Sequence, residues 1–333
     1  MRIMKSWGFY AGKQLLRMLL LMGAVSMVTF FLMKASPVDP LQANVGQAAL
    51  GTMSQEQVEK LRAYWGTDLP PVQQYVSWAK DFVQGEMGTS LLYRRPVESV
   101  IGEKLENSLF LLFFAWVFSG ILGITLGVLA GMYRGSILDK GIKGYCILIA
   151  ATPAFWLALL LLLFFGVWLK VLPIGFSVPI GMEAADVTFF DRMRHAILPI
   201  LTLSFTGVSN ITLHTREKMI DIMESDYMLF ARARGETTWE MFWNHGFRNV
   251  LLPALTLQFA SISEIFGGSV LVEQVFSYPG MGQAAVAAGL GSDLPLLMAV
   301  TMISALFVFG GNLTADLLYH IVDPRIRRSK AAL

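Results

Sequence analysis

The sequence offers few residues with which to make or break bonds. Its four histidines are scattered and its one cysteine, Cys146, lies in an apolar run, so no zinc-ligand spacing and no disulfide within the chain can be drawn. The phosphate-binding pattern G-x-x-x-x-G-K-[ST] is also absent. The most unusual titratable group is Glu264, the one charged side chain in the run 250–272. An ionisable residue among apolar ones is costly, which favours contact with a solute path or a hydrogen bond to a neighbouring helix.

A second candidate site is the segment ARARGETTWEMFWNHGFRNVLLP at 231–253. Gly235 should end one helix, and Thr237 followed three residues later by Glu240 has the spacing of a capping box that starts another. The large aromatic residues of this second helix share one face: Trp239, Phe242, Trp243 and Phe247. Such a face fits a membrane-surface anchor or a docking site for a protein, and the local pattern leaves both interpretations open.

These residues must be positioned by elements that are mostly apolar. The chain has 333 residues, of which 15% are charged, whereas soluble domains average about 25%. A helix needs about 20 apolar residues to cross a bilayer. Six runs qualify: 18–33 extended by Leu15 and Leu16, 108–132, 144–169, 196–215, 249–272 and 294–315. The expected fold class is therefore an all-α polytopic membrane protein with six transmembrane helices.

The distribution of Lys and Arg predicts the orientation of these spans. Segments 1–17, 132–143, 216–249 and 324–333 together hold 16 Lys and Arg, whereas the longer segments 34–107, 169–195 and 273–295 hold 10. The positive-inside rule then places both termini in the cytoplasm. A cleaved signal peptide is the alternative for the first run, but that run is long and no clear cleavage site follows it.

The first external segment, 34–107, is long enough to hold structure of its own. Ser54 and Gln57 have capping-box spacing at the start of a short helix over 53–66. Pro71 suits the first turn of a second helix over 70–85, with Val72, Tyr75, Val76 and Ala79 on one face. These helices are expected to form a small external cap between spans 1 and 2.

Several motifs in order along the chain resemble one family. They are SPVDP (36–40), YWGTDLPPVQQYVSWAKDFVQGEMGTSLLYRRPVESVI (64–101), TPAFWLALLLLLFFGVWLKVLPIG (152–175), GGSVLVEQVFSYPGMG (267–282) and VDPRIR (322–327). Together they are similar to the permease subunits of ABC importers, in the dipeptide, oligopeptide and nickel branch. Val38, Thr67 and the Glu86-Met87 pair depart from the family pattern. The resemblance covers almost the whole chain and implies the type I importer permease fold.

Within this resemblance the segment 231–253 corresponds to the EAA loop, whose alanine and glycine are Ala231 and Gly235. Leu229 stands where the family has Glu. The resemblance implies that this loop is a coupling helix that inserts into a groove of an ATP-hydrolysing subunit. The residues expected to take part are Ala231, Arg232, Arg234, Gly235, Thr237, Trp239, Glu240, Phe242 and Trp243. Trp239, Phe242 and Trp243 are expected to bury in the groove.

The resemblance also implies a set of partners. They are a second similar permease, two ATP-binding subunits that hold ATP and Mg²⁺, an external substrate-binding protein and membrane lipid, with no nucleic acid. This chain itself is expected to hold no cofactor or metal and to catalyse no reaction. Its location would be the bacterial cytoplasmic (inner) membrane. Its cargo would be peptides or peptide-sized metal chelates, and an ion-coupled secondary transporter is the alternative.

The expected organisation follows from these assignments. Residues 1–34 form the cytoplasmic N-terminus and first span, 35–107 the external helical insert, 108–320 a core of five spans with the cytoplasmic loop 216–249, and 321–333 a basic tail. Glu264, Asn210 and Glu273 are candidates for the translocation path. Glu273 lies near a span end, where it is expected to reach water, and Asn312 fits interhelical hydrogen bonding.

Overall fold

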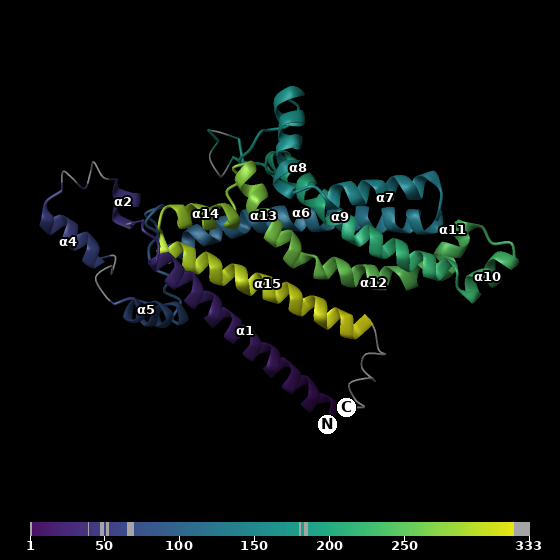
Figure 1. Cartoon of the computed structure of the whole chain (residues 1–333), viewed down its shortest axis with the longest axis horizontal. Helices are drawn as coiled ribbons and strands as arrows, with labels where there is room; N and C mark the ends of the chain where they lie inside the picture. The colour runs from purple at the N-terminus through teal and green to yellow at the C-terminus, as the bar shows by residue number, and fades with distance from the viewer. Residues whose placement is uncertain are drawn as a thin grey trace. The chain divides into compact units, whose positions relative to one another are not determined.

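The structure is a computed structural model that describes residues 2–38, 40–46, 50, 53–64, 70–179, 181–182 and 186–322. All regular secondary structure in these ranges is helical, apart from one isolated bridge between Thr89 and Pro96 (Figure 1). The prediction of an all-α chain is confirmed. The basic tail 323–333 lies outside the described residues.

Four of the described helices are long and apolar enough to cross a membrane. They are α1 (Arg2–Lys34), α6 (Val97–Met132), α9 (Phe189–Met223) and α15 (Leu294–Val322). Two further spans are bent pairs. The first joins α7 (Ile137–Ala150) to α8 (Ala154–Leu161) and the π-helical η1 (Leu162–Trp168). The second joins the helical segment 238–260 to α13 (Ile262–Val275). With each pair counted once, the described residues contain up to six spans, the number expected from the sequence.

The third span, which the apolar run 144–169 predicts, is bent in the structure. α7 and α8 form an angle of 106° across the short break between Ala150 and Ala154. The break contains Pro153, which disfavours a helical conformation at the preceding residue and supplies no N–H for a hydrogen bond. The expected span is therefore present in this region as a bent pair, and its apolar composition did not report the bend.

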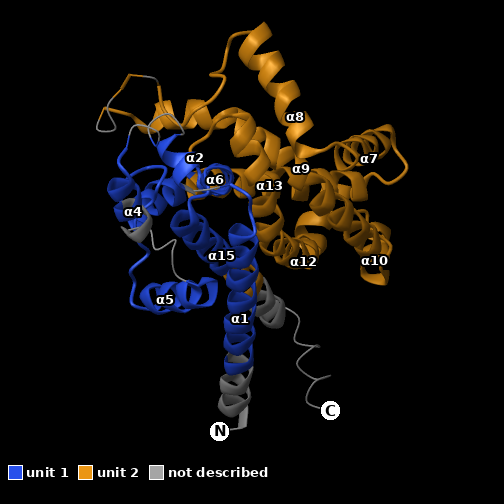
Figure 2. Cartoon of the chain, turned by 60° about the vertical axis from the view of Figure 1, so that its left-hand side comes forward, with its two compact units in different colours: residues 1–107, 280–307 blue, residues 108–279, 308–333 orange. Residues whose placement is uncertain are grey.

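Unit 1 comprises residues 1–107 and 280–307 (Figure 2). It contains α1, α2 (Pro40–Val45), α4 (Gln55–Tyr64), α5 (Pro71–Val83), α14 (Met281–Leu290) and the first parts of α6 and α15. The expected helices over 53–66 and 70–85 are present as α4 and α5. Ser54 and Gln57 form the expected capping box, with the Gln57 N–H donating to Ser54 Oγ at 3.2 Å and the Ser54 N–H donating to Gln57 Oε1 at 3.0 Å.

The packed face of α5 differs from the expected one. Val72 and Val76 are exposed. Tyr75 instead packs against α1, with its ring 5.4 Å from that of Phe30 and its hydroxyl 2.8 Å from Ser26 Oγ. Aromatic side chains bury more area than valine, so the face of α5 that carries Tyr75 turns toward α1.

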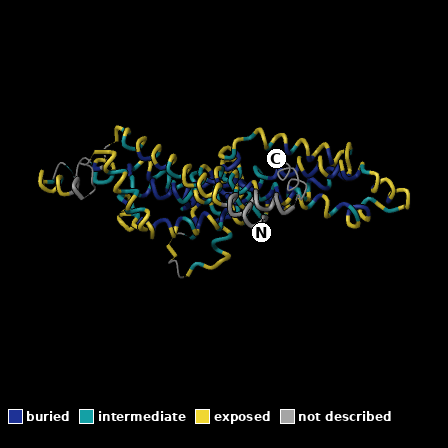
Figure 3. Tube along the Cα trace, turned by 90° about the horizontal axis from the view of Figure 1, so that it is seen from below, coloured by how far each residue is buried: buried dark blue, intermediate teal, exposed yellow. Residues whose placement is uncertain are grey.

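Unit 2 comprises residues 108–279 and 308–333, and its helices pack around α9. α9 contacts α7, α8, α12 (Phe247–Ala260) and α13. Much of α9 is buried, and buried and exposed segments alternate along much of the described chain (Figure 3), although α5 has no buried residue.

A row of glycines lets α6 approach α9 closely. Gly123, Gly127 and Gly131 recur every four residues and therefore lie on one face of α6. A Cβ atom at Gly127 would lie 2.7 Å from the Thr212 carbonyl oxygen, and one at Gly131 would lie 2.8 Å from the Arg216 carbonyl oxygen. Small residues at this spacing are typical of tightly packed membrane helices.

Candidate functional site

The segment between α9 and α12 is built from two short helices joined by a sharp turn. α10 (Asp226–Ala233) is followed by a turn at Gly235, which has a φ of +87°. The Glu236 N–H donates to the Ala231 carbonyl at 3.2 Å, and the Gly235 N–H donates to the Arg232 carbonyl at 3.0 Å. These two bonds are the Schellman arrangement, in which a glycine takes the left-handed conformation after a helix. The expected helix stop at Gly235 is confirmed.

The next helix starts with the expected capping box. The Thr237 N–H donates to Glu240 Oε2 at 2.7 Å, and the Glu240 N–H donates to Thr237 Oγ1 at 3.4 Å. α11 (Thr238–Met241) continues through the π-helical η2 (Phe242–Gly246) into α12. Pro253 lies inside α12, so the helix continues through the proline. α11 is therefore continuous with a helical segment that forms part of a candidate membrane span.

The aromatic face of this helix is divided between the protein interior and its surface. Phe242 is only 5% exposed and lies in a buried cluster with Met219, Met228 and Met241. Its ring contacts Trp243 edge to face, with 5.0 Å between the ring centres. Phe242 is already buried in this chain, which disfavours the expectation that it enters a partner's groove; it attaches the segment to α9.

Trp239 and Trp243 remain on the surface, 46% and 60% exposed. Phe230 on α10 is 67% exposed, and Tyr227 and Leu229 beside it in sequence are also exposed. We call the exposed residues Tyr227, Leu229, Phe230, Arg232, Arg234, Trp239 and Trp243 the loop surface. Sequence reasoning named Arg232 on α10 but missed Tyr227, Leu229 and Phe230, because they are separated from the tryptophans by the turn at Gly235.

The charged side chains of the loop surface that have no partner in this part of the described chain are positive. Within the described part of the chain, the side chains of Arg232 and Arg234 make no hydrogen bond or ion pair, and both are exposed. Glu240 is occupied by the capping box, and Glu236 lies 3.1 Å from His245 Nε2. The two arginines are therefore available to acidic groups of a partner, next to exposed aromatic rings. Ala231 is buried and serves the packing of the loop.

The three candidates for the translocation path have different surroundings. Glu264 is in the first turn of α13, immediately after the 45° bend, and is exposed on this chain. Its carboxylate has no hydrogen bond or ion pair among the described residues, which disfavours a bridge to another helix of this chain. Asn210 is exposed on α9. Asn312 does bridge helices, accepting a hydrogen bond from Ser263 Oγ at 2.8 Å.

Glu273 differs from the expectation that it reaches water. It is 0% exposed, and its Oε1 accepts a hydrogen bond from Ser108 Oγ at 2.7 Å. The carboxylate is therefore enclosed by the chain itself, because α6 packs over this part of α13 through Ser108. The position of Glu273 in the sequence, near the end of an apolar run, did not indicate that α6 covers it.

A buried ion pair near the loop also escaped sequence reasoning. Arg216 on α9 donates from Nε to Asp139 Oδ1 at 2.6 Å and from a second nitrogen to Asp139 Oδ2 at 2.9 Å. The Gly135 N–H donates to the same carboxylate at 2.8 Å. Positions 139 and 216 are far apart in the sequence, so no local pattern links them. The pair fixes the 132–143 turn to the end of α9 from which the loop departs.

Two sequence families match the chain. The family described as "Binding-protein-dependent transport system inner membrane component" matches residues 123–328, and its N-terminal counterpart matches residues 10–96. The first match includes the loop surface, the bent pair that follows it and Glu264. Together the two matches extend from the first span to the last.

Full-length relatives agree with these matches. The oligopeptide transport system permease protein AppB of Bacillus subtilis (strain 168) is 36% identical over 305 residues, 91% of this chain and 94% of the relative. A protein of Brucella abortus (strain 2308), named for a peptide transport system permease, is 34% identical over 91% of this chain and 94% of its own length. A third, from Sinorhizobium fredii (strain NBRC 101917 / NGR234) and named for a peptide ABC transporter permease, is 31% identical over 96% of this chain and 99% of its own length.

The chain belongs to the inner membrane components of binding-protein-dependent transport systems. It is thus a permease subunit of an ABC importer, and the alternative of an ion-coupled secondary transporter is wrong. The family expected from the motifs is confirmed, as is the importer permease fold.

Proposed function

We propose that this chain forms half of the translocation path of an ATP-driven peptide importer and that the loop surface docks onto the ATP-hydrolysing subunits. The relatives named for oligopeptide or peptide transport support the cargo class. A peptide-sized metal chelate is the other cargo that the family resemblance implies. A second permease would complete the path, and an external protein would deliver the cargo.

The observation that carries the docking proposal is the division of the aromatic face. Phe242 holds the segment on the permease, which leaves Trp239 and Trp243 exposed on a helix that is fixed in place. Exposed tryptophan beside unpaired arginine has the composition of an interface hot spot. The unbroken helical path from Thr238 to Ala260 then carries any movement of the docked partner into the membrane.

The mechanism is a shift between two states of the path. ATP and Mg²⁺ would bind on the partner subunits, whose closure would move α11 and, through α12 and the 45° bend, α13. Glu264 follows that bend, so its carboxylate would change position relative to the path in each cycle. The transport rate of a Glu264→Gln variant, with normal assembly, tests this role: an unchanged rate would remove Glu264 from the path.

The double variant Trp239→Ala/Trp243→Ala tests the docking proposal. Aromatic anchors at an interface centre contribute about 2 kcal/mol or more each, so affinity for the ATPases should fall about 30-fold for the loss of one and several hundred-fold, roughly, if the two losses add. The measurements are co-purification of the ATPases and transport per ATP hydrolysed. Trp168→Ala is the matched control, because Trp168 is 76% exposed but lies outside the loop surface. Normal co-purification and coupling in the double variant would show that the tryptophans are a lipid anchor only.

A further inference from the structure

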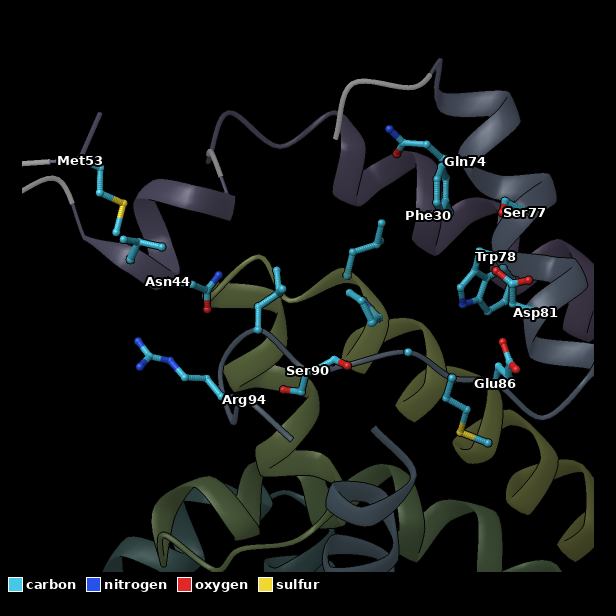
Figure 4. Close-up of a pocket in the computed structure, with 17 residues that line it drawn as sticks. Phe30, Asn44, Met53, Gln74, Ser77, Trp78, Asp81, Glu86, Ser90 and Arg94 are labelled. Atoms are coloured by element: carbon cyan, nitrogen blue, oxygen red, sulfur yellow. The ribbon is translucent and has the colours of Figure 1, made fainter. Parts of the chain in front are cut away.

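Unit 1 contains a cavity of about 880 Å³ that the transport function above does not use. α5, the loop 86–94, the start of α15 and residues near α2 line it. This volume is within the range of small-molecule binding sites, about 300 to 1,000 Å³. Its charged side chains are separated: Arg94 lies at one end, and Asp81 and Glu86 lie at the other (Figure 4).

The acidic end is held in a defined geometry. The Glu86 N–H donates to the Asp81 carbonyl at 2.9 Å, and Gly85 takes a φ of +88°. This is the same helix-ending turn found at Gly235, and it fixes Glu86 beside the last turn of α5. A helix C-terminus carries partial negative charge, so two acidic residues there are unfavourable for the helix. A cation at this end of the cavity would be attracted by both carboxylates and by the helix.

The basic end is preorganised as well. Arg94 has a φ of +52°, a conformation that non-glycine residues adopt only when their surroundings impose it. The surroundings here are a turn in which the Ser90 N–H donates to the Arg95 carbonyl at 2.9 Å. Asp293 secures that turn by accepting hydrogen bonds from Ser90 Oγ at 2.5 Å and from the Leu92 N–H at 3.0 Å.

An unused hydrogen-bond donor lies next to the acidic end. The indole N–H of Trp78 is buried and has no acceptor among the described residues, although Trp78 lines the cavity. Buried donors without an acceptor are rare in folded proteins. Arg94 likewise makes no side-chain hydrogen bond or ion pair within the described ranges.

We propose that this cavity binds a short peptide with free termini, its carboxylate on Arg94 and its ammonium group on Asp81 and Glu86. The inference rests on the proposed function for its cargo class, and it adds a peptide site in the permease's own external insert. A loop of the delivering protein has no free termini and would not satisfy both charged ends.

The test uses the assembled transporter in lipid nanodiscs, without ATP and without the external binding protein. Equilibrium dialysis measures binding of labelled pentaalanine with free termini, of its C-terminal amide and of its N-acetylated form. Saturable binding of the free peptide is expected, and each blocked form should bind about tenfold more weakly, as expected for losing charge-assisted hydrogen bonds.

The variants assign each terminus to its end of the cavity. Arg94→Gln should weaken binding of the free peptide about tenfold but leave binding of the amide unchanged, because the partner of Arg94 is already missing there. The double variant Asp81→Asn/Glu86→Gln should weaken binding of the free peptide about tenfold but leave binding of the N-acetylated form unchanged, because that form has no ammonium group. Arg95→Gln is the matched control for Arg94: Arg95 is on the same turn but pairs with Glu103 at 2.9 Å and does not line the cavity. Glu98→Gln, on the exposed side of α6, is the control for the acidic pair.

Equal binding of free and blocked peptides, or equal losses in Arg94→Gln and Arg95→Gln, would overturn the proposal. It would also fail if the cavity variants weakened only docking of the external binding protein. Peptide transport with that protein is measured separately, with the same transporter in sealed proteoliposomes. Transport without binding to the cavity would reject this site alone, whereas absent peptide transport would reject the proposed cargo.

Discussion

At the scale of single residues, Phe242 and Trp243 are neighbours in sequence, but one is buried and the other is exposed. Phe242 is buried against the methionines of α9 and α10, whereas Trp243 is on the loop surface. Their rings touch, so the buried one sets the position of the exposed one. The exposed ring of the loop surface is therefore supported by the packed interior of the permease.

Phe242→Ala should weaken the attachment of the loop to α9. Removing a buried phenylalanine costs about 3 to 5 kcal/mol, because it loses packed area and leaves a cavity. We expect increased protease cleavage between 226 and 247 and a lower thermal midpoint of the purified permease. Trp243→Ala is the control, since its side chain is 60% exposed and should leave both measurements nearly unchanged. Equal effects of the two variants would contradict the division of roles.

The turn requires glycine at position 235 because the backbone has a positive φ there, and not because a side chain would lack space. Its φ is +87°, and an added Cβ would meet no atom within 4 Å. Gly235→Val should therefore impair the turn through backbone strain and lower transport per ATP hydrolysed. Gly235→Asn should retain most coupling, because asparagine tolerates this region far better than β-branched residues. Similar coupling in both variants would show that the turn does not depend on a positive φ.

At the scale of elements, the glycine row of α6 determines how closely two spans can pack. Gly127→Val would place Cβ 2.6 Å from Thr215 Cβ and 2.7 Å from the Thr212 carbonyl, a backbone atom that cannot move aside cheaply. We expect a lower yield of folded permease, measured by monodisperse size-exclusion elution. Gly102→Ala on the same helix meets no atom within 4 Å and should elute as the unmodified protein does. Normal elution of Gly127→Val would mean that α6 and α9 are less tightly packed.

Elements with local signals were predictable, and those set by distant contacts were not. The capping boxes at Ser54 and Thr237 depend on residues three positions apart, so they can be read from the sequence. The burial of Glu273 under Ser108 and the pairing of Arg216 with Asp139 depend on how helices pack. The loop surface was half predicted for the same reason: its tryptophans share one helix, whereas Phe230 joins them only through the turn.

At the scale of the whole molecule, the orientation in the membrane follows from charge. Segments predicted to face the cytoplasm contain 16 Lys and Arg, and this excess predicts that Thr238 is cytoplasmic and Gln73 external. A cysteine at Gln73 in a Cys146→Ser background should react with an impermeant maleimide in intact spheroplasts. A cysteine at Thr238 should react only after the membrane is opened. The reverse pattern would invert the topology.

The central claim is that the loop surface contacts the ATP-hydrolysing subunits. A photo-reactive benzophenone amino acid in place of Trp243 tests it directly in membranes that contain the whole transporter. We predict a covalent permease–ATPase product after illumination, whereas the same amino acid in place of Trp168, which is also exposed, should give none. Absence of that product from position 243, with the ATPases present and active, would contradict the account.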